Sequence, residues 1–187
     1  MVIMKKSIFA FAFIAMLMTI GCSNTEKPKL VSKLDSYSKM IDEMAAQLDG
    51  AADVAAFDQA LTDSIAAAGA IAQEIEAANL KEEDKKEVMG LLYDAQIKAF
   101  TLKMKVLEKQ NLAAVAGVDA QKAELTAKLE ALKASKAKTA KDSVLIVTKQ
   151  LQDLDSNISV LNAEAAKKVE ALQAEMANLQ VVEDSVQ

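Results

Sequence analysis

Between residues 118 and 187 the chain contains neither glycine nor proline, the two residues that most often interrupt regular secondary structure. The same segment is rich in alanine, lysine, glutamate, glutamine and leucine, which are strong helix formers. No alternating run of β-branched residues occurs outside residues 144–147, and that run lies within a longer helical pattern. These features predict an all-α fold, an elongated antiparallel helical bundle or coiled coil with a long C-terminal helix.

Apolar residues near the C-terminus recur mostly at alternating steps of three and four, which places them along one side of a helix. This C-terminal seam consists of Leu151, Leu154, Ile158, Leu161, Ala165, Val169, Leu172, Met176 and Leu179. Such a seam predicts pairing with another helix, either in the same chain or in a second copy. We therefore expect it to mediate self-association or the binding of a protein partner.

The seam weakens between residues 133 and 141, where Ser135 and Thr139 take positions that leucines hold on either side. Thr139 could cap a new helix, but alanine and lysine in this stretch also propagate helix well. We expect one continuous helix from about residue 119 to about residue 183, within a coiled-coil region of residues 119–187. A break near residues 133–142 is the alternative.

Three shorter helices are expected between residues 30 and 116, because three more apolar stripes have helical spacing. The stripes are Leu34, Tyr37, Ile41, Met44 and Leu48; Val54, Phe57, Leu61, Ile65, Ala68, Ile71 or Ala72, and Ile75; and Val88, Leu91, Leu92, Ala95, Ala99, Leu102 and Val106, with Leu112 near the end.

The boundaries of these helices are marked by capping residues. Gly50 is expected to end the first helix and Asp53 to cap the second. The third is expected to begin after Leu80, where an acidic triplet starting at Glu82 meets the positive end of the helix dipole. Gly117 and its neighbours predict a turn before the long helix.

The N-terminal segment combines Lys5 and Lys6 with a nearly all-apolar run over residues 8–20. This run is shorter than the roughly 20 residues of a membrane-spanning helix. It ends in Thr19-Ile20-Gly21-Cys22, which resembles the lipobox of bacterial lipoprotein precursors, although Thr19 stands where a leucine is usual. Residues 1–21 are therefore expected to be a lipoprotein signal peptide, and residues 22–29 a lipidated tether.

The resemblance implies that the Cys22 thiol is diacylated, that the leader is cut before Cys22, and that the new amino group is acylated with palmitate-like chains. Three acyl chains would hold the protein in a membrane essentially permanently. Ser23 after the cysteine favours the outer membrane, with the protein facing the periplasm or exposed at the surface. An ordinary secretory peptide or an uncleaved anchor is the alternative.

The composition argues against several classes of function. The chain has no histidine, all 22 of its basic residues are lysine, and its formal charge is −5. An acidic chain without arginine binds phosphate backbones poorly, so no nucleic-acid partner is expected. The usual nucleophile systems need histidine, and no glycine-rich loop offers a phosphate cradle. We expect neither enzymatic activity nor a cofactor.

A calcium site is suggested by spacing alone. Asp153, Asp155, Asn157 and Glu164 stand at positions 1, 3, 5 and 12 of the EF-hand loop pattern. The sixth position is Ile158 instead of the glycine that permits the sharp turn, and Ile158 belongs to the seam. We therefore expect a solvated helix face here and no metal site.

Three short segments, around Ser64, Ser143 and Ser185, are similar to the Asp-Ser/Thr-aliphatic acceptor of periplasmic O-glycosylation in Bacteroidetes. Glycosylation at these serines is a further hypothesis.

The sequence predicts a membrane-anchored helical lipoprotein of the cell envelope with a non-enzymatic structural or protein-binding role. A periplasmic holdase or chaperone is the alternative, since tentacled periplasmic chaperones also use long helical arms. A surface adhesin is a third hypothesis.

Overall fold

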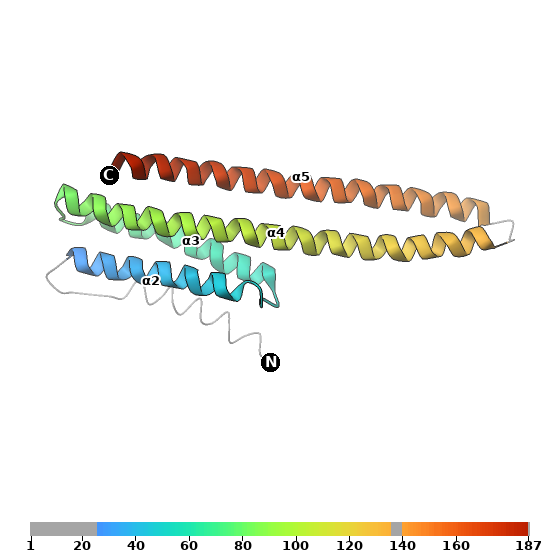
Figure 1. The fold of residues 1–187 in the computed structure, drawn as a ribbon, viewed down its shortest axis with the longest axis horizontal. Coiled ribbons are helices and arrows are strands. Elements are labelled where there is room, and N and C mark those ends of the chain that lie inside the picture. Colours follow the sequence, from blue (N-terminus) through green and yellow to red (C-terminus); the bar gives the residue numbers. More distant parts are fainter. Residues whose placement is uncertain (1–25, 136–139, 187) are drawn as a thin grey trace. The chain divides into compact units, whose positions relative to one another are not determined.

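The computed structural model describes residues 26–135 and 140–186, with side chains as far as residue 182. Its regular elements are four helices: α2 (Glu26–Gln47), α3 (Val54–Ala77), α4 (Glu82–Ala134) and α5 (Ala140–Val186) (Figure 1). They pack antiparallel, and no strand occurs in the described residues. The predicted all-α antiparallel fold is confirmed.

The chain divides into two compact units. The first, which we call the bundle, comprises the chain up to Val106 together with the C-terminal segment from Ala171. The second, which we call the arm, comprises Leu107–Glu170 and is formed by the later part of α4 and the earlier part of α5.

Helix α2 starts earlier than the sequence suggested. Residues 26–29, which we expected to belong to the tether, form its first turn, and Pro28 is the third helical residue. Proline is tolerated there because the first N–H groups of a helix have no partner within the helix. The expected tether is therefore wrong for these four residues, and residues 22–25 lie outside the described part of the chain.

The short connection between α2 and α3 follows the capping signals in part. Helix α2 ends at Gln47, three residues before Gly50. Asp53 is the N-cap of α3 as predicted, since its side chain accepts a hydrogen bond of 2.9 Å from the backbone N–H of Ala56. Such a cap satisfies one of the free N–H groups at the start of a helix.

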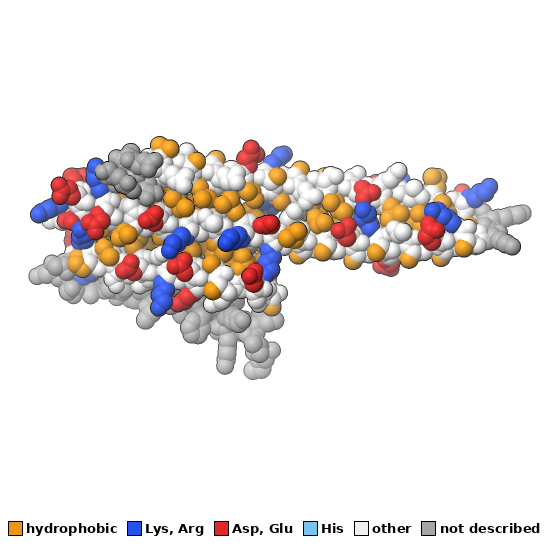
Figure 2. All heavy atoms as spheres, viewed as in Figure 1, with side chains coloured by type: hydrophobic (Ala, Val, Ile, Leu, Met, Phe, Trp, Pro, Cys, Tyr) orange, Lys and Arg blue, Asp and Glu red, His pale blue; other side chains and the backbone are white. Residues whose placement is uncertain are grey.

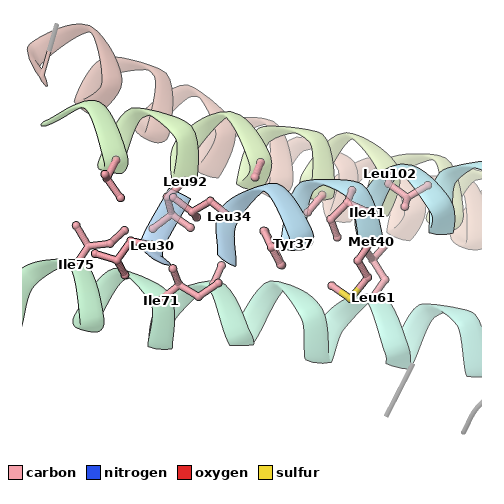
Figure 3. Close-up of a cluster of buried hydrophobic side chains, with 14 of the residues drawn as sticks. Leu30, Leu34, Tyr37, Met40, Ile41, Leu61, Ile71, Ile75, Leu92 and Leu102 are labelled. Atoms are coloured by element: carbon pink, nitrogen blue, oxygen red, sulfur yellow. The ribbon is translucent and has the colours of Figure 1, made fainter. Parts of the chain in front are cut away.

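The hydrophobic core of the bundle is built by α2, α3 and α4 (Figure 3). Its buried members are Leu30, Leu34, Tyr37, Met40, Ile41, Leu48, Leu61, Ala68, Ile71, Ile75, Val88, Leu92, Ala95, Ala99, Leu102 and Val106. Most of the three predicted stripes are found here, while Met44, Val54, Phe57, Ile65 and Ala72 pack at the edge. Each large side chain removed from water contributes about 1.5–3 kcal/mol.

Lysines bridge every pair of the three core helices. The ion pairs between Nζ and carboxylate oxygens are Lys27 with Asp84 and Glu87, Lys98 with Asp42, Lys33 with Glu74, Lys103 with Asp58, and Lys85 with Glu76. The more exposed of these pairs, such as Lys98 with Asp42, contribute little stability, so the apolar core dominates the folding energy. The pairs instead favour one arrangement of the three helices over others.

The predicted turn around Gly117 is absent, because Gly117 lies inside α4. A Cβ atom added to Gly117 would meet nothing within 4 Å, so no close neighbour requires a glycine. Glycine costs a helix only about 1 kcal/mol relative to alanine. The surrounding alanines and the pairing with α5 offset that cost, and α4 continues through the predicted turn.

The continuous helix expected from about residue 119 to about residue 183 is also absent. Helix α4 ends at Ala134 and α5 begins at Ala140, so the alternative, a break near residues 133–142, is correct. The local sequence allows helix throughout, but a continuous helix would leave the apolar side of each half unpaired within the chain. Reversal lets α5 pack along α4, and burial of both stripes outweighs the lost helical hydrogen bonds.

Candidate protein-binding surface

The described residues contain no group of three or more His, Cys, Asp or Glu side chains that could hold a metal ion. The segment with EF-hand spacing, from Asp153 to Glu164, is continuous helix within α5. At 1.5 Å per residue its two ends are about 16 Å apart, too far to share one ion. Asp155 instead pairs with Lys122. The acidic triplet starts α4 as predicted, and Asp84 in it pairs with Lys27.

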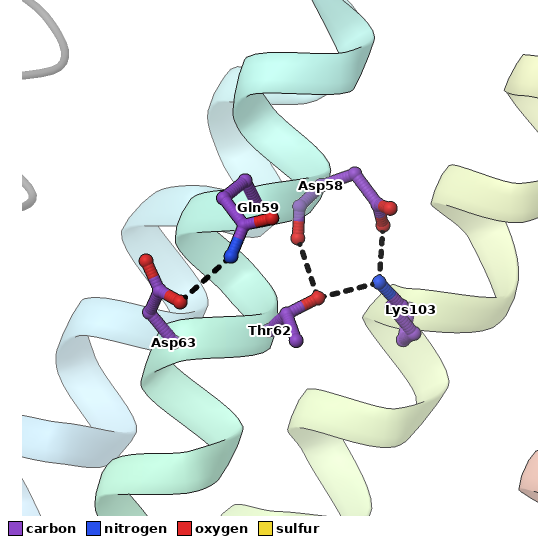
Figure 4. Close-up of polar contacts among 5 residues, drawn as sticks. All are labelled: Asp58, Gln59, Thr62, Asp63 and Lys103. Atoms are coloured by element: carbon purple, nitrogen blue, oxygen red, sulfur yellow. Dashed lines mark hydrogen bonds and ion pairs between the residues drawn. The ribbon is translucent and has the colours of Figure 1, made fainter.

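A partly buried polar cluster connects α3 and α4 (Figure 4). The Nζ atom of Lys103 donates to Asp58 Oδ1 at 2.5 Å and to Thr62 Oγ1 at 2.7 Å, while the Thr62 hydroxyl donates to the Asp58 carbonyl oxygen. Gln59 donates to Asp63 one turn away. The ammonium and carboxylate satisfy each other, so the cluster joins two helices and offers no free nucleophile or base.

Two buried polar atoms, Tyr37 Oη and Gln96 Oε1, have no hydrogen-bond partner among the described residues. Tyr37 is fully buried in the core, and burial raises the pKa of its hydroxyl well above the ordinary value. An unpaired buried hydroxyl costs roughly 1–3 kcal/mol. Burial, and then the charge of Glu76, also raise the pKa of Tyr93. Neither tyrosine hydroxyl is poised to act as an acid or base near neutral pH.

Along α5 the C-terminal seam is half-buried throughout, while the residues between its members are exposed. The structure therefore brings the predicted seam residues together on one side of one helix. In the described part of α5 only Ala140 and Val147 are buried. The seam covers part of α4, but it contributes no residue to the buried core.

A matching stripe on α4 was not recognised in the sequence. Its half-buried members are Tyr93, Ile97, Phe100, Met104, Leu107, Asn111, Val115, Val118, Lys122, Leu125, Leu129 and Leu132. They recur at steps of three and four, which was the available signal, but Asn111 and Lys122 interrupt the apolar pattern and Gly117 suggested a turn. Helix α4 therefore has two apolar sides, one in the core and one against α5.

Two polar contacts set the register of the arm. Asn111 donates from its side-chain amide to Asn162 Oδ1 at 2.9 Å, and Lys122 Nζ lies 2.5 Å from Asp155 Oδ1. The hydrogen bond to Asp155 raises the pKa of the Lys122 ammonium above its ordinary value. Polar residues within an apolar seam specify register, because any shift leaves them without partners.

Several large apolar side chains of the arm remain in water. Leu112 is 63% exposed, Leu145 73%, Ile146 59% and Val160 54%. Leu112 was expected to lie near the end of a buried stripe, and that expectation is wrong, because the stripe of α4 that faces α5 follows a different side of the helix. Ile146 and Val160 are about four helical turns apart and share nearly one face of α5.

The surface of the molecule carries both charge signs, with lysines and acidic residues interspersed over the visible face (Figure 2). Hydrophobic side chains are visible between them along both helices of the arm (Figure 2). No large field of one sign is visible there, so a partner would contact apolar groups bordered by charges rather than a purely electrostatic patch.

The modification hypotheses have different outcomes. Ser64 is buried and donates its hydroxyl to the Ala60 carbonyl oxygen at 2.8 Å, so it is not accessible for glycosylation in the folded protein. Ser143 is half-buried near the start of α5, and the side chain of Ser185 lies outside the described residues.

The predicted lipidation residue, Cys22, also lies outside the described residues. None of the described helices is long and apolar enough to cross a membrane.

Comparison with known proteins gives no match to any family model, curated protein or solved structure.

The core and the seam differ in burial, so truncating a leucine in each should lower the free energy of unfolding by different amounts. Leu61 is fully buried, so Leu61→Ala should lower the free energy of unfolding by about 2–5 kcal/mol. Leu161 is half-buried in the arm, and Leu161→Ala should cost less than about 2 kcal/mol because the arm can relax around it. Urea unfolding followed by circular dichroism measures both. Equal costs would contradict the difference in packing between bundle and arm.

Tyr37→Phe should leave stability at pH 7 unchanged or raise it, because the variant removes a buried hydroxyl without a partner. Above about pH 10 the unfolded chain ionises its tyrosines while buried Tyr37 stays neutral, so wild-type stability falls with rising pH. The variant's free energy of unfolding relative to wild type should be about 1 kcal/mol more favourable at pH 10.5 than at pH 7. Urea unfolding at both pH values tests this, and a constant difference would refute it.

Proposed function

We propose that this protein is a non-enzymatic scaffold of the bacterial cell envelope, held to a membrane by lipid on Cys22, whose arm binds other proteins. The observation that carries the proposal is the arm itself. It consists of the later part of α4 paired with the earlier part of α5, and over 107–135 and 140–170 only Ala140 and Val147 are buried. An element of this kind exposes much surface for little core.

The exposed residues of the arm support protein binding more than simple spacing. A spacer needs only polar residues outside its seam, whereas Leu145, Ile146 and Val160 remain in water on α5. Apolar side chains bordered by charged ones resemble the contact regions of transient protein interfaces. A partner that covers Ile146 and Val160 would recover the free energy of burying both.

The membrane part of the proposal rests on the sequence. The lysine-containing leader and the lipobox-like Thr19–Cys22 segment support lipidation, and Ser23 supports the outer membrane, facing the periplasm. A lipid anchor gives a protein without a membrane-spanning helix in its described part a means of attachment.

A second candidate, a holdase for unfolded chains, is favoured by the same exposed apolar residues. Holdases bind many clients through adaptable apolar surfaces. The defined positions of Ile146 and Val160, on one face with a set register, favour a specific partner over a range of clients.

Cys22→Ser should abolish acylation and lipid-dependent cleavage before residue 22, because it removes the thiol that carries the lipid. The variant is expected to accumulate as uncleaved precursor or to be released as soluble product, while Ser23→Ala stays attached to a membrane. Fractionation of cells expressing each variant, with mass spectrometry of the wild-type N-terminus, measures this. A Cys22→Ser product that is cleaved to the wild-type N-terminus and stays on the membrane would show that the lipid anchor is not used.

Protein binding by the arm predicts crosslinks from one face. A photo-crosslinking residue at Val160 should capture a discrete protein partner in intact cells, and Ile146→Lys should abolish that crosslink because it puts a charge into the apolar contact. Thr148→Lys adds the same charge at an exposed position that lies about 120–160° around the helix from Val160 and Ile146. It serves as the matched control and should leave the crosslink unchanged. Many weak crosslinks to unrelated proteins would favour the holdase, and none would contradict both functions.

A further inference from the structure

The chain between the predicted lipid anchor and the folded bundle is short. The sequence suggested a tether over residues 22–29, but α2 begins at Glu26. Four peptide units therefore join Cys22 to Glu26, and a chain of that length spans at most about 14 Å even when fully extended. The longer tether would have allowed about twice that distance.

The first turn of α2 is fixed to the rest of the bundle. Glu26 Oε2 accepts a hydrogen bond of 2.7 Å from the backbone N–H of Asn79. Lys27 Nζ donates to Asp84 Oδ1 at 2.6 Å, and Leu30 in the next turn is buried in the core. Unwinding α2 to lengthen the tether would break these contacts, so the limit of about 14 Å applies to the folded bundle.

The same contacts place three segments at one end of the bundle. Asn79 belongs to the connection between α3 and α4, and Asp84 belongs to the first turn of α4. Figure 1 shows the starts of α2 and α4 at the same end. We call residues 26–29 and 78–86 the anchor end, because the proposed acyl chains on Cys22 lie within reach of it.

The anchor end carries mixed charge and little exposed apolar surface. Leu80 is its one large aliphatic side chain, and it is half-buried. Among the described residues, Lys29, Lys81, Lys86, Glu82 and Glu83 of this end form no ion pair, whereas Lys27 pairs with Asp84 and Glu87, and Lys85 pairs with Glu76. Such a surface suits lipid headgroups, which carry phosphate and ammonium groups, and not the hydrocarbon layer, where charges are costly.

We propose that the anchor end of the bundle lies on the lipid headgroups of the membrane, where the four-residue tether holds it. This inference rests on the proposed lipidation of Cys22. Lys29 and Lys81 meet lipid phosphates there. Gln47, at the other end of α2, lies about 32 Å from Glu26 along the helix and stays off the membrane surface.

The test uses the acylated protein in vesicles of phosphatidylethanolamine with a minority of phosphatidylglycerol. Cys22 is the only cysteine of the chain, so a second cysteine is the single thiol left to label once Cys22 is acylated. A fluorophore on Asn79→Cys reports on the anchor end, and one on Gln47→Cys is the matched control at an exposed position of the other end. A lipid with a nitroxide on its headgroup, which quenches only at short range, should quench the first severalfold more than the second.

The length of the tether is tested by insertion. A Gly-Ser segment of about 20 residues between residues 25 and 26 spans about 25 Å on average. It should lower the quenching at Asn79→Cys severalfold, because the bundle then leaves the surface. The same segment appended after residue 187 is the control and should leave the quenching unchanged. Circular dichroism checks that each variant keeps its helical content.

Equal quenching at the two positions, or none at Asn79→Cys, would overturn the inference. Strong quenching that survives the insertion before residue 26 would overturn the tether as its cause. Mass spectrometry of the N-terminal peptide separates these results from a failure of the proposed function. An unmodified Cys22 would refute the lipid anchor itself, whereas an acylated Cys22 with equal quenching would refute only the placement of the anchor end.

Discussion

The whole structure depends on the need to bury two apolar sides of one helix. One side of α4, represented by Val88, Leu92 and Val106, packs in the core with α2 and α3. The other, represented by Phe100 and Leu125, is half-buried along α5. A single neighbour covers only one side of a helix, so the chain must place elements on both, and the antiparallel arrangement follows from short connections between them.

The two units meet this need with different amounts of burial. The bundle has fully buried side chains from three helices, whereas the arm has little more than a two-helix seam. Stability therefore concentrates in the bundle, while Leu112, Leu145, Ile146 and Val160 of the arm remain exposed to water.

The charged and polar residues follow the same division. In the bundle, lysines such as Lys33 and Lys103 are held between helices by carboxylates and help to select one arrangement. In the arm, Asn111 and Lys122 interrupt the apolar seam and select its register. Spacing alone suggested a calcium loop at Asp153, but the apolar phase through Ile158 correctly indicated helix, because burial of the seam outweighs a local loop pattern.

The sequence by itself determined the helical class, the buried stripes of the core, the Asp53 cap and the C-terminal seam, because these depend on local propensity and on periodicity within one helix. Only the tertiary structure decided that α4 passes through Gly117, that the chain reverses between Ala134 and Ala140, and that the seam pairs with α4 of the same chain. Alanine and lysine near the reversal permit both helix and turn. The choice is made by which apolar surfaces meet across the chain, and that information is not local.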